Sequence, residues 1–235
     1  MLEDRAGNLW LGTRSSGILR VMRRGITSFG AEDNIDFIRS AFPCDGNQVC
    51  FVGFLANTAL DGRGAKANIT GQQFSPFLWQ LGKFEEQGFT WIRPDSMAEI
   101  KYFGWGDKQN SFQSRNGEWW IATGEGLFRF PPGDFGKLKT SRPLIFFNAA
   151  NGLNPVDVFR IYEDSREDVW IATNGNNKQA IFRWERATEK LHNLNSEILS
   201  VVPVKAGFVN LIKRRPRRRY LARLLRFRHR TTQKR

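Results

Sequence analysis

The chain has 235 residues, of which 40% are hydrophobic and 25% are charged, and this balance excludes wholesale disorder. No apolar run reaches the roughly 18 residues of a membrane-spanning helix, and we expect no secretory leader, because Met1 runs straight into Leu2-Glu3-Asp4-Arg5. Twenty Phe, eight Trp and 22 Gly favour β-strands joined by frequent turns. The disulfide-rich, collagenous, membrane-spanning and coiled-coil classes are therefore excluded.

The formal net charge is +13, from 36 basic and 23 acidic residues, but the charge is not spread evenly. Residues 213–235 contain twelve Lys or Arg and no Asp or Glu. Subtracting those twelve leaves 24 basic against 23 acidic residues in 1–212, so the body is nearly neutral. Because the last acidic residue is Glu197, we expect a domain of residues 1–197 and a basic tail of residues 198–235.

The chain opens with a hairpin pattern in Leu2–Thr13 (LEDRAGNLWLGT). The apolar opener ends one strand, Asp4–Asn8 carry tight-turn residues, and a second strand follows on which Trp10 and Gly12 share one face. A Gly-containing turn then leads to a third strand that ends near Arg20. A large ring beside a glycine lets one sheet pack closely on the next.

A worn second copy of this pattern follows at Cys44–Gly53. There we expect Phe51 to replace the Trp, with one extra residue in the turn. The next segment, Asn57–Gln73, is polar, Gly-rich and without alternation, and it is predicted to be an insertion of 17 residues.

The only two cysteines, Cys44 and Cys50, lie within this second copy. A hairpin brings them within disulfide range if the compartment is oxidising. The interpretation we favour is that they are buried free thiols. With no His nearby, they do not make a structural zinc site, which needs four ligands.

Two clearer copies lie at Phe112–Thr123 (FQSRNGEWWIAT) and Tyr162–Thr173 (YEDSREDVWIAT). Both align with the first copy without gaps, keep Trp at the ninth position and end in Thr. The expected repeat markers are the aromatic residues Trp10, Phe51, Trp120 and Trp170, the threonines Thr13, Thr123 and Thr173, and the turn carboxylates Asp4 and Asp164. The aromatic markers are 41, 69 and 50 residues apart, and removing the insertion reduces the 69 to 52.

A period in the forties to low fifties is that of one four-stranded propeller blade. Residues Gly152–Asn193 read as one whole blade. Its expected strands are Val158–Tyr162, Val169–Thr173, Ala180–Trp184 and Lys190–His192. We therefore predict an all-β chain: a partial β-propeller of about four blades, with a basic C-terminal tail that is disordered or forms a short helix.

These copies resemble the two-component regulator propeller repeat, whose units read approximately as apolar-Glu-Asp-x-x-Gly-Asn-apolar-Trp-apolar-Gly-Thr, then Gly-apolar-x-Arg. Leu2–Arg20 matches this pattern almost completely. Tyr162–Arg183 has Glu167 where Gly is usual, and Phe112–Arg129 has Gln113-Ser114 in place of Glu-Asp. The resemblance covers most of the chain before the tail, although poorly matching segments separate the copies.

The resemblance implies a β-propeller ligand sensor, of the kind that sits outside the inner membrane ahead of a membrane span and a histidine kinase. It implies a periplasmic or extracytoplasmic location and a small ligand such as a glycan fragment. The chain carries no kinase and begins inside a repeat. We therefore interpret it as a fragment, whose ring is completed by missing blades or by a homo-oligomer; without a leader, a cytoplasmic location stays open.

The basic tail, KRRPRRRYLARLLRFRHR at residues 213–230, has three interpretations. We favour out-of-frame translation past a break in the gene, because acidic residues and the repeat both stop after Glu197. The second interpretation is a membrane-surface helix, and the third is a nucleic-acid-binding arm. The residues that would bind anionic lipid or nucleic acid non-specifically are Arg214, Arg215, Arg217, Arg218 and Arg219.

No catalytic or cofactor constellation is apparent in the sequence. Of the two histidines, His192 lies on an expected outer strand and His229 in the tail. The pairs Glu3-Asp4 and Glu163-Asp164 recur at one repeat position, which favours a structural role in holding turn amides. We expect a non-catalytic binding module without cofactor or metal. The alternatives are a propeller-scaffold lyase or hydrolase, or a structural protein-interaction propeller.

Overall fold

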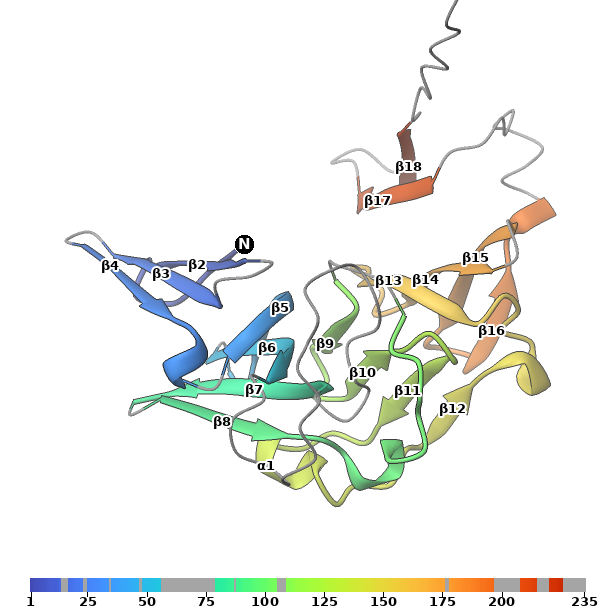
Figure 1. The fold of residues 1–235 in the computed structure, drawn as a ribbon. Coiled ribbons are helices and arrows are strands. Elements are labelled where there is room, and N and C mark those ends of the chain that lie inside the picture. The colour runs from blue at the N-terminus through green and yellow to red at the C-terminus, as the bar shows by residue number, and fades with distance from the viewer. Residues whose placement is uncertain are drawn as a thin grey trace, which may run out of the picture.

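In a computed structural model the chain forms four antiparallel sheets of four strands each, which follow one another along an arc (Figure 1). Strand order equals chain order in every sheet, so each sheet is an up-and-down meander, and we number the sheets as blades 1 to 4. The prediction of an all-β chain with about four propeller blades is confirmed. The structure describes residues 1–13, 17–22, 25–33, 35–46, 48–55, 79–86, 88–104, 109–175, 178–196, 208–214 and 220–225.

The strands of each blade are as follows. Blade 1 contains β1 (Leu2–Glu3), β2 (Leu9–Gly12), β3 (Ile18–Met22) and β4 (Gly25–Phe29). Blade 2 contains β5 (Ile35–Cys44), β6 (Gln48–Leu55), β7 (Trp79–Glu85) and β8 (Gly88–Ile92). Blade 3 contains β9 (Ser111–Gln113), β10 (Trp119–Ala122), β11 (Leu127–Phe130) and β12 (Ile145–Phe147). Blade 4 contains β13 (Asp157–Glu163), β14 (Val169–Gly175), β15 (Lys178–Glu185) and β16 (Lys190–Asn193).

Four short helical turns lie in the described ranges: η1 (Ala31–Asp33), η3 (Asp95–Met97), α1 (Phe135–Leu138) and η4 (Ala149–Asn151). Asn195 and Ser196 are also helical. The tail contains an antiparallel pair, β17 (Phe208–Arg214) and β18 (Tyr220–Leu225). The expected disordered or short helical tail is wrong for these two segments, where FVNLIKR is rich in β-branched and aromatic residues. The predicted insertion Asn57–Gln73 lies outside the described residues.

Apolar cores fill the seams between consecutive blades. We call the face of a blade toward the preceding blade its leading face, and the opposite face its trailing face. Trp10, on the trailing face of blade 1, packs with Ile38 and Phe51 of blade 2. Trp120, on the trailing face of blade 3, packs 5.0 Å from Trp184 of blade 4 between ring centroids. Burial at three such seams is what joins the blades into one body.

The small residue and the Thr of each repeat serve the same seams. A Cβ added to Gly12 would lie 2.8 Å from the Ile38 side chain, so only glycine allows blades 1 and 2 to approach this closely. The Thr13 carbonyl accepts from the Ile38 N–H at 3.5 Å, and the Thr123 carbonyl accepts from the Val158 N–H at 3.0 Å. The repeat therefore places a backbone hydrogen bond to the following blade at the same point in both seams.

Strand pairing identifies the equivalent residues of the four blades. The marker Trp residues pair across β2–β3, β10–β11 and β14–β15 with a basic residue: Trp10 with Arg20, Trp120 with Arg129, and Trp170 with Arg183. In blade 2 the residue in this register is Cys50, which pairs with Lys83.

The prediction that Phe51 replaces the Trp is therefore wrong. Phe51 lies one position later and points from the leading face of blade 2 into the core around Trp10. The turn holds no extra residue, because Phe42 pairs with Cys50 over the same eight-residue interval that separates Leu2 from Trp10. An aromatic side chain at the neighbouring position suggested the wrong register.

Cys44 and Cys50 form a disulfide, with their Cα atoms 5.8 Å apart. Both residues are buried, at 2% and 0% exposure. The favoured interpretation of free thiols is therefore wrong, because the β5–β6 hairpin brings both side chains to the same face of the sheet, as alternation along the two strands requires.

Candidate functional site

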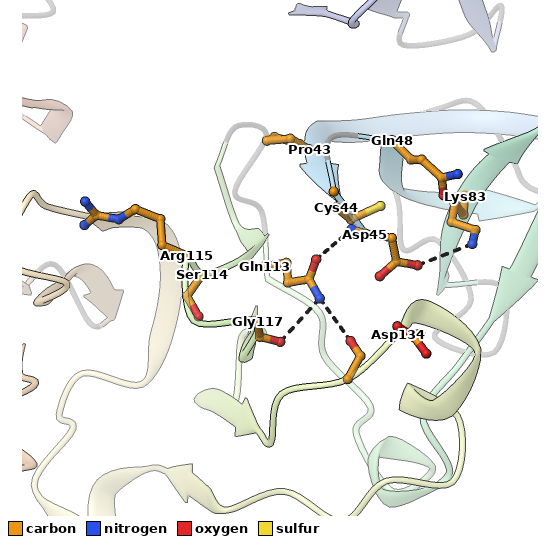
Figure 2. A pocket seen from close by; sticks show the side chains of 12 residues that line it. Pro43, Cys44, Asp45, Gln48, Lys83, Gln113, Ser114, Arg115, Gly117 and Asp134 are labelled. Carbon is orange, nitrogen blue, oxygen red and sulfur yellow. Dashed lines mark hydrogen bonds and ion pairs between the residues drawn. The ribbon is translucent and has the colours of Figure 1, made fainter.

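A polar pocket of about 690 Å³ opens between blades 2 and 3, at the end of the sheets where the first and second strands are joined (Figure 2). Its lining residues are Pro43, Cys44, Asp45, Gly46 and Gln48 from the β5–β6 hairpin, Lys83 from β7, Gln113, Ser114, Arg115 and Gly117 from the β9–β10 hairpin, and Gly133 and Asp134 ahead of α1. Most of the lining groups are hydrogen-bond donors or acceptors, so the pocket suits a polar ligand.

Asp45 joins the two walls of the pocket. Its backbone N–H donates to Oε1 of Gln113 at 2.7 Å, and its carboxylate accepts from Nζ of Lys83 at 3.3 Å (Figure 2). The same carboxylate accepts from the backbone N–H of Phe135 at 3.0 Å. Asp45 adopts a left-handed backbone (φ 41°), a conformation that Asp tolerates better than most residues. The turn of blade 2 is thereby tied to the first strand and the short helix of blade 3.

A similar tie recurs at the next seam. Gln113 and Glu163 hold the same position in their blades, one residue after the partner of the marker Trp. Gln113 accepts the N–H of Asp45, and Glu163 accepts both the backbone N–H and Nε–H of Arg115, each at 3.2 Å. Arg115 also donates to the backbone carbonyl of Asp164. The first position of the Glu-Asp pair, held by Gln113 in blade 3 and Glu163 in blade 4, thus accepts a hydrogen bond from the turn of the preceding blade.

Burial and pairing shift the pKa values of the charged groups around the pocket in opposite directions. Burial disfavours the charge of Lys83, but hydrogen bonds and attraction from Glu85 and Asp45 outweigh it and raise the Lys83 pKa above its ordinary value. Burial raises the pKa of Glu163, although the hydrogen bonds from Arg115 act in the opposite direction. The pocket therefore holds a persistently charged Lys83 beside a carboxylate partner.

The predicted turn carboxylates clamp the marker Trp rings. In blade 1, Oδ2 of Asp4 accepts from Nε1 of Trp10 at 2.8 Å, and its Oδ1 accepts from the backbone N–H groups of Ala6 and Asn8. Blade 4 repeats this arrangement, since Oδ2 of Asp164 accepts from Nε1 of Trp170 at 3.1 Å. One carboxylate thus holds both the turn and the ring, which is a structural task.

The equivalent positions of blades 2 and 3 solve the same task differently. In blade 2 they are Cys44 and Cys50, so a disulfide stands where blades 1 and 4 have the Asp–Trp hydrogen bond, and its Cys44 lines the pocket. In blade 3 they are Ser114 and Trp120; the Ser114 hydroxyl donates to the Glu118 carbonyl, and the buried Nε1 of Trp120 has no hydrogen-bond partner among the described residues.

None of the predicted marker residues lines the pocket. Trp10 and Trp120 are 1% and 0% exposed, whereas Trp170 is half-buried. Thr123 and Thr173 are fully buried, and the hydroxyls of Thr13 and Thr123 each donate to a carbonyl across the β2–β3 and β10–β11 turns, at 2.9 Å. Of the predicted basic tail residues, Arg214 ends β17, and Arg215, Arg217, Arg218 and Arg219 lie outside the described residues.

Sequence reasoning missed the pocket residues Gln48, Lys83 and Asp134. They come from three separate segments that only the packing of blades 2 and 3 brings together. Only Lys83 had a signal in the sequence pattern, because it holds the position of the Arg that pairs with the marker Trp in the other blades. In the described part of the chain, no group of three or more His, Cys, Asp or Glu side chains has the arrangement of a metal site.

A family model described as "Two component regulator propeller" matches residues 152–175, which run from the end of η4 through β13 and its turn to the end of β14. No curated protein matches the chain. Two solved structures match with a TM-score of 0.56 and 18% identity, over 84% of this chain and 25% of theirs. They are described as the extracellular domain of the putative hybrid two component system BT4673, and of the putative one component system BT4673, from B. thetaiotaomicron.

At 18% identity the solved structures show a shared propeller fold. The chain spans a quarter of the length of these extracellular domains. Among the helices of the described residues, none has the length and apolar character to cross a membrane.

Proposed function

We propose that the chain is a ligand-sensing module that binds without catalysis, outside the cytoplasmic membrane. The match of residues 152–175 to the two-component regulator propeller model supports this proposal. The observation that carries the proposal is the pocket between blades 2 and 3. Its walls belong to two blades that Asp45 and Gln113 join, so a ligand there contacts both sides of one seam. Occupancy would favour one relative position of the two blades, which is what a sensor requires.

The ligand that fits this pocket best is small, polar and rich in hydroxyl groups, such as a glycan fragment. Gln48 and Asp134 are exposed at the rim, and Lys83 and Asp45 lie deeper. These groups supply hydrogen-bond donors and acceptors both at the rim and deeper in the pocket, while the lining contains no aromatic ring on which a sugar face could stack. We therefore propose recognition by hydrogen bonds.

An oxidising compartment is part of this proposal. Cys44, which lines the pocket, forms a disulfide with Cys50 within the hairpin that carries Asp45. Disulfides persist in periplasmic and extracellular proteins and are rare in the cytosol. The solved relatives are described as extracellular domains, which supports the same location.

The test is calorimetric titration of the full chain with a panel of neutral and acidic oligosaccharides, under oxidising conditions. Gln48→Ala and Asp134→Ala should weaken the binding of a responding ligand at least tenfold while the melting temperature stays unchanged, because both side chains are exposed. The matched control is Glu86→Ala, an exposed residue in the β7–β8 turn outside the pocket. Equal affinity in all four proteins would refute the pocket assignment.

The same titrations separate a sensor from a propeller-scaffold enzyme. A sensor returns its ligand unchanged, so chromatography and mass spectrometry after prolonged incubation should recover the intact oligosaccharide. Cleaved or unsaturated products that appear with the wild type and not with the pocket variants would replace the sensor proposal with a hydrolase or lyase. Failure of the entire panel would favour a structural interaction propeller.

A further inference from the structure

Among the described residues that line the pocket, four side chains are charged: Asp45 and Asp134 are acidic, and Lys83 and Arg115 are basic. The two signs balance in number, but a ligand meets a charge only where the rest of the protein leaves that charge available. The partners of these four groups therefore decide which ligand charge the pocket favours.

The guanidinium of Arg115 belongs to the seam between blades 3 and 4. Its Nε donates to the Glu163 carboxylate at 3.2 Å, and its Nη2 donates to the backbone carbonyl of Asp164. Both acceptors lie in blade 4, and Figure 2 shows the guanidinium directed away from Asp45 and Lys83. An acidic ligand group held between blades 2 and 3 therefore gains little from Arg115.

Two carboxylates hold the other cation, Lys83. Its Nζ lies 3.3 Å from the Asp45 carboxylate and 3.2 Å from the Glu85 carboxylate. Burial disfavours the charge of Lys83, yet the hydrogen bonds to these two carboxylates leave its pKa raised. An acidic ligand group that approached Nζ would also approach both carboxylates, and their repulsion would offset the attraction.

The Asp134 carboxylate is held more weakly than either cation. Asp134 stands at the N-cap of α1, but its side chain makes no capping hydrogen bond, and the N–H of the next residue, Phe135, donates to Asp45. Its ion-pair partner is Lys137 at 3.4 Å, and the Asp134 and Lys137 side chains are 77% and 76% exposed. An exposed pair of this kind contributes little, so a ligand cation can readily take the place of Lys137. Among its described lining residues, the pocket therefore presents an available negative charge and no equally available positive charge.

We propose that the pocket selects polyhydroxylated ligands that carry a primary ammonium group, such as a glycan with free amino groups, over acidic ligands of the same size. This inference rests on the proposed function, because it assigns a charge preference to the same pocket. The ligand ammonium donates to the Asp134 carboxylate in place of Lys137, while Gln48 and the other lining groups bind ligand hydroxyls. Because a hydrogen bond between an ammonium and a carboxylate is stronger than one between neutral groups, this one contact sets the preference.

Calorimetric titration of the full chain under oxidising conditions, at about pH 6 where carboxylates are ionised, tests the preference. The probes are three tetrasaccharides, of glucosamine, of N-acetylglucosamine and of galacturonic acid. Only binding that Gln48→Ala weakens is assigned to the pocket, which sets aside attraction of the acidic probe to the basic tail. The glucosamine probe should bind about tenfold more tightly than the acetylated probe, and the acidic probe should bind most weakly.

Equal pocket binding of the glucosamine and acetylated probes, or tightest binding of the acidic probe, would overturn the preference and leave the proposed function standing. Absence of pocket binding by all three probes would also overturn the preference, and the wider oligosaccharide panel would then decide the proposed function by itself.

Asp134→Asn tests the assigned carboxylate, because it keeps the shape of the side chain and removes its charge. The variant should bind the glucosamine probe about tenfold more weakly and the acetylated probe within about twofold of the wild type, with an unchanged melting temperature. Lys137→Ala removes the competing cation and should tighten binding of the glucosamine probe. The matched control is Glu86→Gln, at an exposed carboxylate outside the pocket, which should leave all three affinities unchanged. An equal loss in Asp134→Asn and Glu86→Gln would assign the preference to long-range attraction and refute the role of Asp134.

Discussion

Blades 2 and 4 close the same turn with different chemistry. In blade 4 the Asp164 carboxylate accepts a hydrogen bond from the Trp170 ring, and in blade 2 the Cys44–Cys50 disulfide joins the equivalent positions. Both arrangements connect the end of the first strand to the second strand, two residues past the turn. The repeat therefore conserves a connection in space, while the residues that make the connection change.

The difference has a consequence for the pocket. A carboxylate clamp weakens when the carboxylate is protonated, whereas a disulfide is indifferent to pH and sensitive to reductant. The turn held by the disulfide is the one whose Asp45 reaches Gln113, Lys83 and Phe135. The disulfide thus lies in the turn that carries Asp45, which joins blade 2 to Gln113 and Phe135 of blade 3.

The largest effect should come from the Trp that has no clamp. Trp120 is 0% exposed and packs on Phe147 and Trp184, so Trp120→Ala should cost about 3–5 kcal/mol of unfolding free energy. Trp170→Ala, at a half-buried ring, should cost less, about 1–2 kcal/mol. Urea unfolding followed by circular dichroism gives both values. Equal losses of unfolding free energy in the two variants would show that packing at a seam does not determine how much the Trp ring stabilises the fold.

Removing the disulfide should have the next largest effect. The disulfide closes a short loop and so restricts the unfolded chain. Cys44→Ala together with Cys50→Ala removes that restriction and should lower the free energy of unfolding by about 2 kcal/mol. Reductant should lower the wild-type melting temperature and leave that of the double variant unchanged. Ligand binding in the pocket should weaken in parallel, because Asp45 follows Cys44 directly. A wild-type protein that melts identically with and without reductant would contradict this prediction.

The Asp–Trp clamp should respond to pH instead. Burial alone raises the pKa of Asp4, but hydrogen bonds from Trp10, Asn8 and the turn amides outweigh it and lower the pKa below its ordinary 3.8. The stabilisation is therefore present above about pH 4 and is lost as pH falls through the folded-state pKa. Asp4→Asn should cost about 1 kcal/mol at pH 7, and the gap should close between roughly pH 5 and 2. A gap that is constant over this range would exclude the carboxylate as its cause.

A smaller effect of opposite sign is expected in blade 3. Ser114 takes the place of the clamp carboxylate, and no described residue supplies an acceptor to the buried Nε1 of Trp120. Ser114→Asp supplies one and should raise the free energy of unfolding by about 0.5–1 kcal/mol. Thermal melting at pH 7 and pH 3 should show the gain only at the higher pH. A loss at pH 7 would mean that the nearby carboxylate of Glu118, already paired with Arg129 and Arg186, repels the new charge.

The repeat made the blade architecture predictable, because its Trp, Gly or Ala, and Thr each perform a local task that recurs. In blade 4 the four expected strands agree with β13 to β16 within about two residues at each end. The register of blade 2 was not predictable in the same way, since Cys50 shares no chemistry with Trp and the adjacent Phe51 mimics it. The pocket was beyond prediction because Gln48, Lys83 and Asp134 meet only after two blades have packed.

The smallest effect on folding should come from removing the basic tail. All three seams between blades are formed by residues before Glu197, so a chain that ends before Lys205 should unfold within about 0.5 kcal/mol of the full chain. Its affinity for anionic vesicles or for duplex DNA should disappear, since the twelve basic residues of 213–235 are gone and the remaining body is nearly neutral. In the full chain the same binding should fall steeply between 50 and 200 mM salt and show no sequence preference, as expected for contacts with phosphate alone. A truncated chain that still recognises one DNA sequence would locate a nucleic-acid site on the blades themselves.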